Sequence, residues 1–290
     1  MAINWFPGHM HKTRKALVKL MPQTDVVIEV LDARLPHASH NPLLAELRGS
    51  VPCFYVVTKT DLADPEKTHQ WQQYFQQQNW PSVWGNTVHD ELVSQLKKQV
   101  RALVPTRGTA DKPLRLLVVG IPNVGKSTLL NKLVGRKICT VGNTPAVTRE
   151  AQRIKVETGL VVFDTPGVMW PKPEDEECGY RLALSGAIRD TAFEYPDVAY
   201  FAIEALQKRY PQQLQTAYHL ESLHEDPLEN MAAIAKRRGM VSRGEPQWQR
   251  VSELIVHEFR QGKIGRFTLE LPERGCCITS IAKKFEAKSD

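Results

Sequence analysis

The fold is decided by the stretch Gly120-Ile121-Pro122-Asn123-Val124-Gly125-Lys126-Ser127-Thr128. It follows an apolar run, residues 114–119, that predicts a strand, and it precedes residues 129–134, whose pattern predicts a helix. Two glycines separated by four residues let successive backbone N–H groups point inward at phosphate oxygens, and the positive end of the helix adds to them. A strand, a glycine-rich loop and a helix in this order predict a phosphate-binding loop rather than a chance turn.

The residue types in this loop suit a nucleoside triphosphate. The Lys126 ammonium would reach the β- and γ-phosphates, and the Ser127 hydroxyl would ligate Mg²⁺. The nucleotide-binding residues that we predict in this loop are Asn123, Val124, Gly125, Lys126, Ser127 and Thr128.

Length and composition are ordinary for a globular protein with two domains of moderate size: 290 residues, 42% hydrophobic and 24% charged. The formal charge of +6 favours a polyanionic partner, although it is also compatible with simple solubility. Five cysteines without a CxxC pair indicate a reduced, intracellular protein without a structural zinc. Because no apolar stretch reaches about 18 residues and no signal or transit peptide begins the chain, we expect a cytoplasmic protein that does not enter the membrane.

A second motif, Thr58-Lys59-Thr60-Asp61, ends the apolar residues 51–57, which predict a buried strand. A carboxylate at the end of a parallel strand can accept hydrogen bonds from N1–H and the exocyclic amine of guanine, a donor pair that adenine does not offer. The lysine stem can lie along the face of the purine. A Lys-x-Asp sequence also occurs in solvated loops, but beside a phosphate loop it predicts guanine contacts from Thr58, Lys59 and Asp61.

A third motif, Asp164-Thr165-Pro166-Gly167, follows another apolar run, residues 159–163. In nucleoside triphosphatases a strand ending in Asp-x-x-Gly supplies an aspartate on the Mg²⁺ side and a glycine whose N–H meets the γ-phosphate. We therefore predict these two roles for Asp164 and Gly167.

The order of these motifs is changed relative to ordinary small GTPases, in which the guanine-reading motif comes last. Here it precedes the phosphate loop, while strands and helices still alternate as a doubly wound, mostly parallel sheet requires. The sequence thus predicts an α/β fold, a circularly permuted P-loop GTPase domain in residues 1–175, with the polar residues 105–113 joining the old termini. Helical patterns at residues 180–190, 198–210, 228–238 and 247–260 predict a small all-helical domain in residues 176–290.

Together with this order, three stretches resemble the ribosome biogenesis GTPase A family: Trp5-Phe6-Pro7-Gly8-His9-Met10, Asp32-Ala33-Arg34-Leu35-Pro36 and Asp164-Thr165-Pro166-Gly167. The resemblance covers nearly the whole chain. It implies a GTP-hydrolysing factor that binds the maturing large ribosomal subunit and its rRNA and promotes a late step of assembly.

The resemblance also assigns further site residues. It implies base contacts at Asn86 and Thr87, and it adds Thr148 to Ser127 and Asp164 as Mg²⁺ ligands. The chain departs from the family pattern at three places: Thr58 replaces the usual Asn, Ala146 replaces Gly before Thr148, and residues 85–87 lack a clear Ser-Ala signature.

The catalytic group is not the usual one. Many GTPases place a water-orienting glutamine directly after Asp-x-x-Gly, but here that residue is Val168. The resemblance offers His9, in a segment hinged at Gly8, as the substitute; the alternative is that His9 serves only docking or structure. Asn123 resembles the asparagine with which potassium-activated GTPases hold K⁺, but it is equally explained as a residue that favours turns.

Basic residues gather in the predicted helical domain, where they suit RNA phosphates or simply form a solvated face; they are Lys236, Arg237, Arg238, Arg243, Arg250, Arg260, Lys263 and Arg266. Three functions remain open. The first is a GTPase, slow alone and stimulated by the ribosomal particle, acting as a monomer. The second is a GTP-gated RNA-binding module without efficient hydrolysis, and the third is a potassium-dependent GTPase of tRNA modification.

Overall fold

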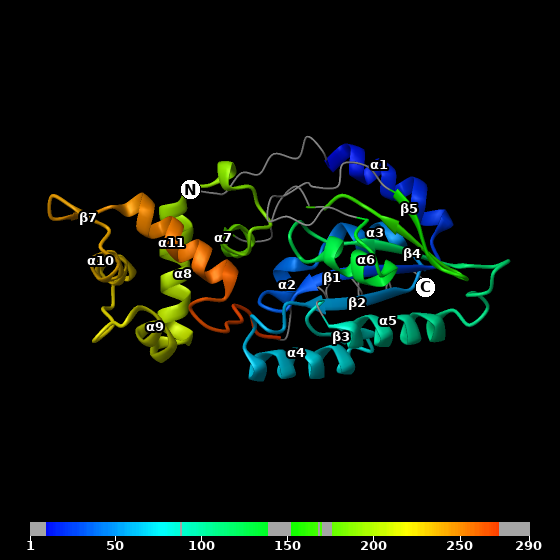
Figure 1. Ribbon diagram of the computed structural model, residues 1–290, viewed down its shortest axis with the longest axis horizontal. Helices are drawn as coiled ribbons and strands as arrows, with labels where there is room; N and C mark the ends of the chain where they lie inside the picture. The colour runs from blue at the N-terminus through cyan, green and yellow to red at the C-terminus, as the bar shows by residue number, and fades with distance from the viewer. Residues whose placement is uncertain (1–9, 88, 139–151, 168, 170–175, 273–290) are drawn as a thin grey trace, which may run out of the picture. The chain divides into compact units, whose positions relative to one another are not determined.

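The computed structural model describes residues 10–87, 89–138, 152–167, 169 and 176–272. These residues divide into two compact units: an α/β unit, which includes residues 10–169 and again 270–272, and a helical unit of residues 176–269 (Figure 1). The expected boundary between residues 175 and 176 lies at the edge of the undescribed residues 170–175 and stays a prediction.

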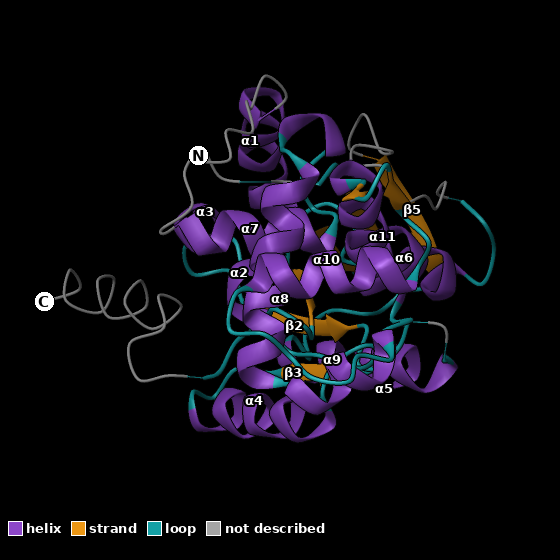
Figure 2. Ribbon diagram, turned by 90° about the vertical axis from the view of Figure 1, so that its left-hand side faces the viewer, coloured by secondary structure: helices purple, strands orange, loops and turns teal. Residues whose placement is uncertain are grey.

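One six-stranded sheet organises the α/β unit, with the strand order β3-β2-β1-β4-β6-β5. Its pairings are parallel except that β5 runs antiparallel to β6 at one edge. The strands are β1 Val26–Asp32, β2 Cys53–Thr58, β3 Ser82–Trp84, β4 Leu114–Val119, β5 Gln152–Glu157 and β6 Leu160–Asp164, drawn in orange in Figure 2. β1, β4 and β6 read as almost continuous apolar runs because helices cover both faces of a parallel sheet.

The helices of this unit are α1 Met10–Leu20, α2 Pro36–Ser39, α3 Pro42–Arg48, α4 Pro65–Gln77, α5 Asp90–Leu103 and α6 Lys126–Val134, with a 3₁₀ turn at Met21–Gln23. Two of them begin at residues whose side chains cap the helix N-terminus. Asn41 caps α3 by accepting a hydrogen bond from the Leu43 N–H, and Asp64 caps α4 by accepting from the Glu66 and Lys67 N–H groups. The predicted circularly permuted α/β fold is confirmed, because the three motifs follow β2, β4 and β6 of one mostly parallel sheet in the predicted order.

The core lies between the sheet and these helices. One buried cluster joins Leu17 of α1 and Leu44 of α3 to Val27, Leu117 and Phe163 on neighbouring strands. A second cluster packs α4 on β2 and includes three aromatic side chains, Tyr55, Trp71 and Phe75. The helical spacing of the aromatics in residues 65–78 therefore reflects core packing rather than a base-stacking surface.

The end of the described chain returns to the α/β unit at Glu270, which is buried. Its carboxylate accepts hydrogen bonds from the backbone N–H groups of His37, at 2.8 Å, and Ala38, at 3.1 Å, in α2. Its carbonyl oxygen accepts a hydrogen bond of 3.1 Å from the indole N–H of Trp71 in α4. Glu270 thus fixes the segment that follows the helical unit onto two helices of the α/β unit.

The helical unit is built around α8 Tyr195–Arg209, which contacts α7, α9, α10 and α11. The other elements are α7 Glu176–Ser185, a 3₁₀ turn at Asp190–Ala192, α9 Pro211–Tyr218, α10 Pro227–Arg237, α11 Trp248–Gln261 and a hairpin of β7 Val241–Ser242 with β8 Glu245–Pro246 (Figure 1). Three details differ from the sequence prediction. α7 begins four residues earlier and ends at Ser185, α9 was not expected, and residues 241–246 form a small hairpin with Arg243 and Gly244 at positive φ.

Candidate functional site

The phosphate loop connects β4 to α6 and starts at Gly120. This residue has φ +148°, and a Cβ there would lie 2.5 Å from the carbonyl oxygen of Val30 on β1. The backbone of the loop therefore touches the neighbouring strand directly, so that only glycine fits at its first position. Gly125 precedes α6 at the other end, which leaves the N–H groups of the first helical turn facing the loop.

Lys126 is held inside this loop by the loop itself. Its Nζ donates hydrogen bonds to the carbonyl oxygens of Gly120, at 3.0 Å, and Ile121, at 2.6 Å, and only 8% of the residue is exposed. Burial lowers the pKa of its amine to about 8. The nearby Asp164 carboxylate opposes this shift, and the charge of Lys59 adds to it. The ammonium group is thus positioned before any phosphate arrives.

Thr58, the departure from the usual Asn, connects the guanine-reading motif to the phosphate loop. Its hydroxyl lies 2.6 Å from the carbonyl oxygen of Val124 and 3.0 Å from that of Leu31, and it is fully buried. Because one hydroxyl carries one proton, the shorter distance favours Val124 as the acceptor. Thr58 therefore has a structural role here, because its hydrogen bond connects the end of β2 to the phosphate loop.

Replacing Thr58 by valine should weaken guanine nucleotide binding by about fivefold to tenfold, because it removes this hydrogen bond and leaves a buried carbonyl without its donor. Thr58→Asn, which restores an amide donor, should bind within about twofold of the wild type. Titration of a fluorescent GDP analogue measures both. Equal affinity of Thr58→Val and the wild type would show that the bond between β2 and the loop does not support the site.

Asp61 and Lys59 differ in their surroundings at the end of β2. Asp61 is exposed, so its carboxylate is accessible to a ligand. Lys59 has a left-handed backbone, with φ +58°, and its Nζ donates a 2.8 Å hydrogen bond to Asp32 at the end of β1. Asp32 belongs to one of the stretches that carry the family resemblance, but its contact with Lys59 joins the ends of two strands and cannot be inferred from the order of residues.

Asp164 and Gly167 lie at the end of β6, which pairs with β4. Asp164 is buried, and its charge acts on Lys126 as described above. The backbone of Gly167 packs so closely on the phosphate loop that a Cβ would lie 2.9 Å from the nitrogen and 3.0 Å from the Cα of Pro122. The third motif therefore meets the first in space, as their predicted roles require.

The remaining predicted residues are placed less directly. Asn86 and Thr87 follow β3, the strand beside β2, and Thr87 is buried; the Asn86 carbonyl accepts from the His89 N–H at 3.1 Å. His9 and Thr148 lie outside the described residues. Asn123 has φ +60°, a conformation that asparagine tolerates well, and this alone accounts for an Asn at that position. K⁺ binding at Asn123 stays a prediction.

The residues present are compatible with Mg²⁺ bound together with a nucleotide. GTPase domains use Mg²⁺, and the donor set here, the Ser127 hydroxyl and the Asp164 carboxylate, consists of the oxygen ligands that this ion prefers. Within the part of the chain that the structure describes, no group of three or more His, Cys, Asp or Glu residues forms a metal cage.

Comparison with known proteins places the chain in a family. The model of the 50S ribosome-binding GTPase family matches residues 115–234. Ribosome biogenesis GTPase A of Bacillus cereus is 40% identical over 281 residues, covering 94% of this chain and 95% of that protein. The chain belongs to the ribosome biogenesis GTPase A family. The mouse protein named mitochondrial ribosome-associated GTPase 1 is 33% identical over 92% of this chain and 89% of its own length.

Solved structures extend this family likeness to the whole fold. A GDP-bound structure of YlqF superposes with a TM-score of 0.66 at 27% identity, covering 88% of this chain and 98% of that one. GNP-bound YlqF from T. maritima gives a TM-score of 0.63 at 25% identity over 90% of this chain and 99% of that one. Both covered ranges exceed the α/β unit, so this member of the ribosome biogenesis GTPase A family shares the permuted domain and the helical region that follows it.

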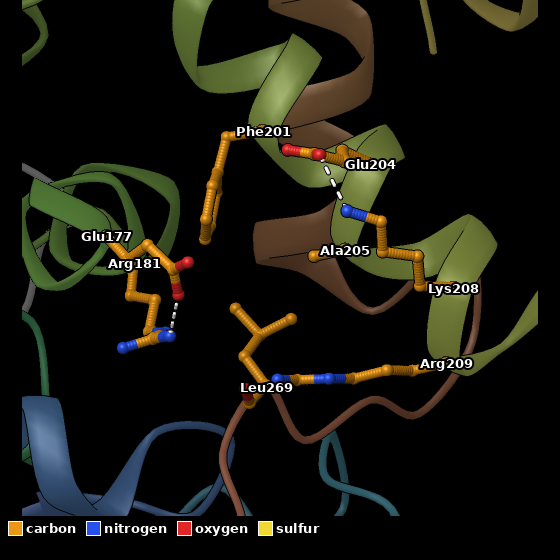
Figure 3. Close-up of a pocket in the computed structure, with 8 residues that line it drawn as sticks. All are labelled: Glu177, Arg181, Phe201, Glu204, Ala205, Lys208, Arg209 and Leu269. Atoms are coloured by element: carbon orange, nitrogen blue, oxygen red, sulfur yellow. Dashed lines mark hydrogen bonds and ion pairs between the residues drawn. The ribbon is translucent and has the colours of Figure 1, made fainter. Parts of the chain in front are cut away.

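The helical unit of this family member contains a small cavity of about 90 Å³, shown in Figure 3. It is lined by Glu177, Arg181, Phe201, Glu204, Ala205, Lys208, Arg209 and Leu269. Its charges are paired with one another, Lys208 with Glu204 at 2.7 Å and Arg181 with Glu177, and Arg209 donates to the Leu269 carbonyl. These pairs leave the cavity with a mixed lining that selects no ligand class.

Among the predicted basic residues, Arg237 and Arg238 form ion pairs with Glu221 and Glu258, whereas Arg260 binds the backbone of α7. Its guanidinium donates to the carbonyl oxygens of Ala183, at 2.8 Å, and Leu184, at 3.1 Å, and to Asp190, at 2.9 Å. It therefore closes the end of α7, which makes it less available to RNA than its place in the sequence indicated. None of the described helices is long and apolar enough to cross a membrane.

Proposed function

We propose that this chain is a GTP-hydrolysing assembly factor that binds the maturing large ribosomal subunit and its rRNA and promotes a late step of assembly. The observation that carries the proposal is the joining of the three motifs: Thr58 bonds to Val124 of the phosphate loop, and Gly167 packs on Pro122. Family membership supports the ribosomal partner, because relatives over nearly the whole chain are named for ribosome biogenesis.

In the proposed mechanism each residue has one task. Asp61 reads guanine, Lys126 holds the β- and γ-phosphates, and the Gly167 N–H meets the γ-phosphate. Ser127, Asp164 and Thr148 would hold Mg²⁺, which supplies positive charge to the transferring phosphoryl group. His9 would orient the attacking water, and Asn123 would hold K⁺ if that ion contributes.

Hydrolysis in this proposal is slow in the free protein and stimulated by the large subunit, and the factor acts as a cytoplasmic monomer. Single-turnover GTP hydrolysis with and without large-subunit particles tests this directly. Stimulation by the particle supports an assembly GTPase. GTP-dependent particle binding without faster hydrolysis would instead support a GTP-gated RNA-binding module, and co-sedimentation with tRNA fractions alone would favour the tRNA-modification alternative.

Guanine selectivity should follow Asp61. Its carboxylate would accept from two guanine donors, and an Asn at this position presents one acceptor and one donor instead. We expect Asp61→Asn to lose GTP affinity by about a hundredfold, as expected for hydrogen bonds to a charged group, and to gain affinity for xanthosine triphosphate. Competition of GTP, xanthosine triphosphate and ATP against a fluorescent GDP analogue measures the change. A wild type that binds ATP as tightly as GTP would contradict the proposed function itself.

A further inference from the structure

Asp32 is a fully buried carboxylate that joins two cations at the ends of β1 and β2. Its Oδ1 accepts hydrogen bonds from the backbone N–H and the Nε of Arg34, both at 3.0 Å. Its Oδ2 accepts from Arg34 Nη2 and from Lys59 Nζ, both at 2.8 Å. Arg34 and Asp32 are each 1% exposed, whereas the Lys59 side chain is 23% exposed.

The backbone around this carboxylate is fixed as firmly as its side chain. The Asp32 N–H donates a 3.0 Å hydrogen bond to the Ser39 hydroxyl, and the Ala33 N–H donates a 2.9 Å bond to the carbonyl of Thr58. The second bond joins the start of the turn after β1 to the residue that precedes Lys59. The carboxylate is therefore a rigid anchor built on the same strand ends that carry the guanine-reading motif.

Electrostatics keep the anchor charged. Burial alone would raise the pKa of Asp32, but the neighbouring Arg34 and Lys59 charges hold it well below its usual range. Burial lowers the pKa of Lys59, and the attraction of Asp32 opposes that shift. Because Arg34 already pairs with Asp32 on two of its nitrogens, the Lys59 contact is not needed to neutralise the buried carboxylate. The contact instead fixes the end of a long, flexible side chain.

We propose that Asp32, backed by Arg34, is a positioning residue for the nucleotide base: it holds the Lys59 ammonium so that the methylene stem of Lys59 forms one wall of the purine site. This inference rests on the proposed function, because it takes the Thr58-Lys59-Thr60-Asp61 turn as the guanine site. A free lysine side chain loses rotamer entropy when it is ordered. Because Asp32 already orders Lys59 in the nucleotide-free protein, this entropy is not lost when the nucleotide binds.

The test is nucleotide binding by Asp32→Asn, which keeps the shape of the side chain and removes its charge. We expect the dissociation constants for GDP, GTP and inosine triphosphate to rise together by about tenfold, mainly through faster dissociation. Their ratios should not change, because a methylene wall does not distinguish purines by their hydrogen-bonding groups. Asp61→Asn, in contrast, changes those ratios, so the two roles are separable in the same assay.

Asp25→Asn is the matched control. Asp25 precedes β1 at the opposite end of the same strand and also pairs with an arginine, Arg115, through bonds of 2.9 and 3.0 Å. It has no contact with Lys59 among its described partners. If loss of a carboxylate paired with arginine simply destabilises the fold, both variants should lower the thermal midpoint without changing the dissociation constant of the folded protein.

A second variant keeps the inference testable if Asp32→Asn does not fold. Lys59→Met retains the stem but removes the anchored ammonium, and it should weaken GDP binding to a similar degree. In the double variant the two effects should not add, since Asp32 acts through Lys59. Unchanged or tighter binding by Lys59→Met, or full additivity, would overturn the inference while leaving GTP selectivity in the wild type intact. A wild type without that selectivity would overturn the proposed function instead.

Discussion

Lys126→Ala should lose at least about a hundredfold in GTP affinity, which corresponds to about 2.7 kcal/mol. Two effects combine. The variant removes a positive charge from the phosphates, and it leaves the carbonyl oxygens of Gly120 and Ile121 without the donor that now binds both. Because the amine is already held in the loop, the wild type loses little side-chain entropy when it binds the phosphates. In the alanine variant, water cannot replace this preordered contact. Calorimetry or fluorescence titration with GTP and GDP measures the loss.

Lys132→Ala is the control for this variant. Lys132 lies on the same helix, α6, and its amine pairs with Asp90 at 2.8 Å, where Asp90 is exposed. We expect its GTP affinity to stay within about twofold of the wild type, since exposed ion pairs contribute at most about 1 kcal/mol to stability. Equal nucleotide affinity in Lys126→Ala and Lys132→Ala would remove the assigned role from the phosphate-loop lysine.

The pKa of Lys126 gives the same prediction a pH dependence. In the nucleotide-free protein burial lowers this pKa to about 8, and negative phosphates would raise it again on binding. Binding therefore takes up a proton above about pH 8, so GTP affinity should fall as the pH rises from 8 to 9.5. A matching proton uptake should be visible in two buffers of different ionisation enthalpy. Affinity that stays constant across this range would contradict the assignment.

His9→Ala should reduce particle-stimulated GTP hydrolysis by about 10²–10⁴-fold, the usual contribution of a positioned acid–base or water-orienting group. GTP affinity should remain nearly unchanged, because the phosphate and base contacts that we propose involve other residues. The loss of hydrolysis is expected because Val168, which follows Gly167, has no side-chain hydrogen-bonding group with which to orient water. Single-turnover hydrolysis on saturating large subunits, with the affinity measured in parallel, separates catalysis from binding.

His11→Ala serves as the matched variant, since it removes a histidine two residues further along the sequence. It should retain most of the stimulated rate. Equal stimulated turnover in His9→Ala and the wild type would transfer the catalytic role to another group, with K⁺ at Asn123 or ribosomal RNA as the next candidates. Repeating the assay with K⁺ replaced by Na⁺ distinguishes those two.

The fold was predictable because its determinants are local in the sequence. A window of about ten residues is enough to recognise the strand before the phosphate loop, the helix after it and each of the two motifs that end a strand. The order of these motifs alone implies the permutation. α9 was missed because its sequence, Pro-Gln-Gln-Leu-Gln-Thr-Ala-Tyr, presents only two side chains to the core, Leu214 and Tyr218. So short an apolar signal cannot be separated from a loop.

The candidate site was predictable only in part, for a related reason. Motif spacing predicted Lys126, Asp61 and Asp164, but no spacing rule links Thr58 to Val124 or Asp32 to Lys59, since each contact joins segments far apart in the sequence. Thr58 departs from the family pattern, and its hydroxyl is shorter than the amide of the usual Asn. The close approach of β2 to the loop lets the shorter group reach its acceptor.

Glu270 has a consequence for how this protein is made. Its carboxylate and carbonyl bind α2 and α4, whose residues are synthesised roughly two hundred positions earlier. The helical unit is therefore an insertion in the chain of the α/β unit and not an appendage to it. During translation the α/β unit lacks the segment that contains Glu270 until the whole helical unit has left the ribosome, although domains generally fold in order from the N-terminus. A truncation after residue 175, made to isolate the α/β unit, would therefore also remove the Glu270 segment, which belongs to that unit.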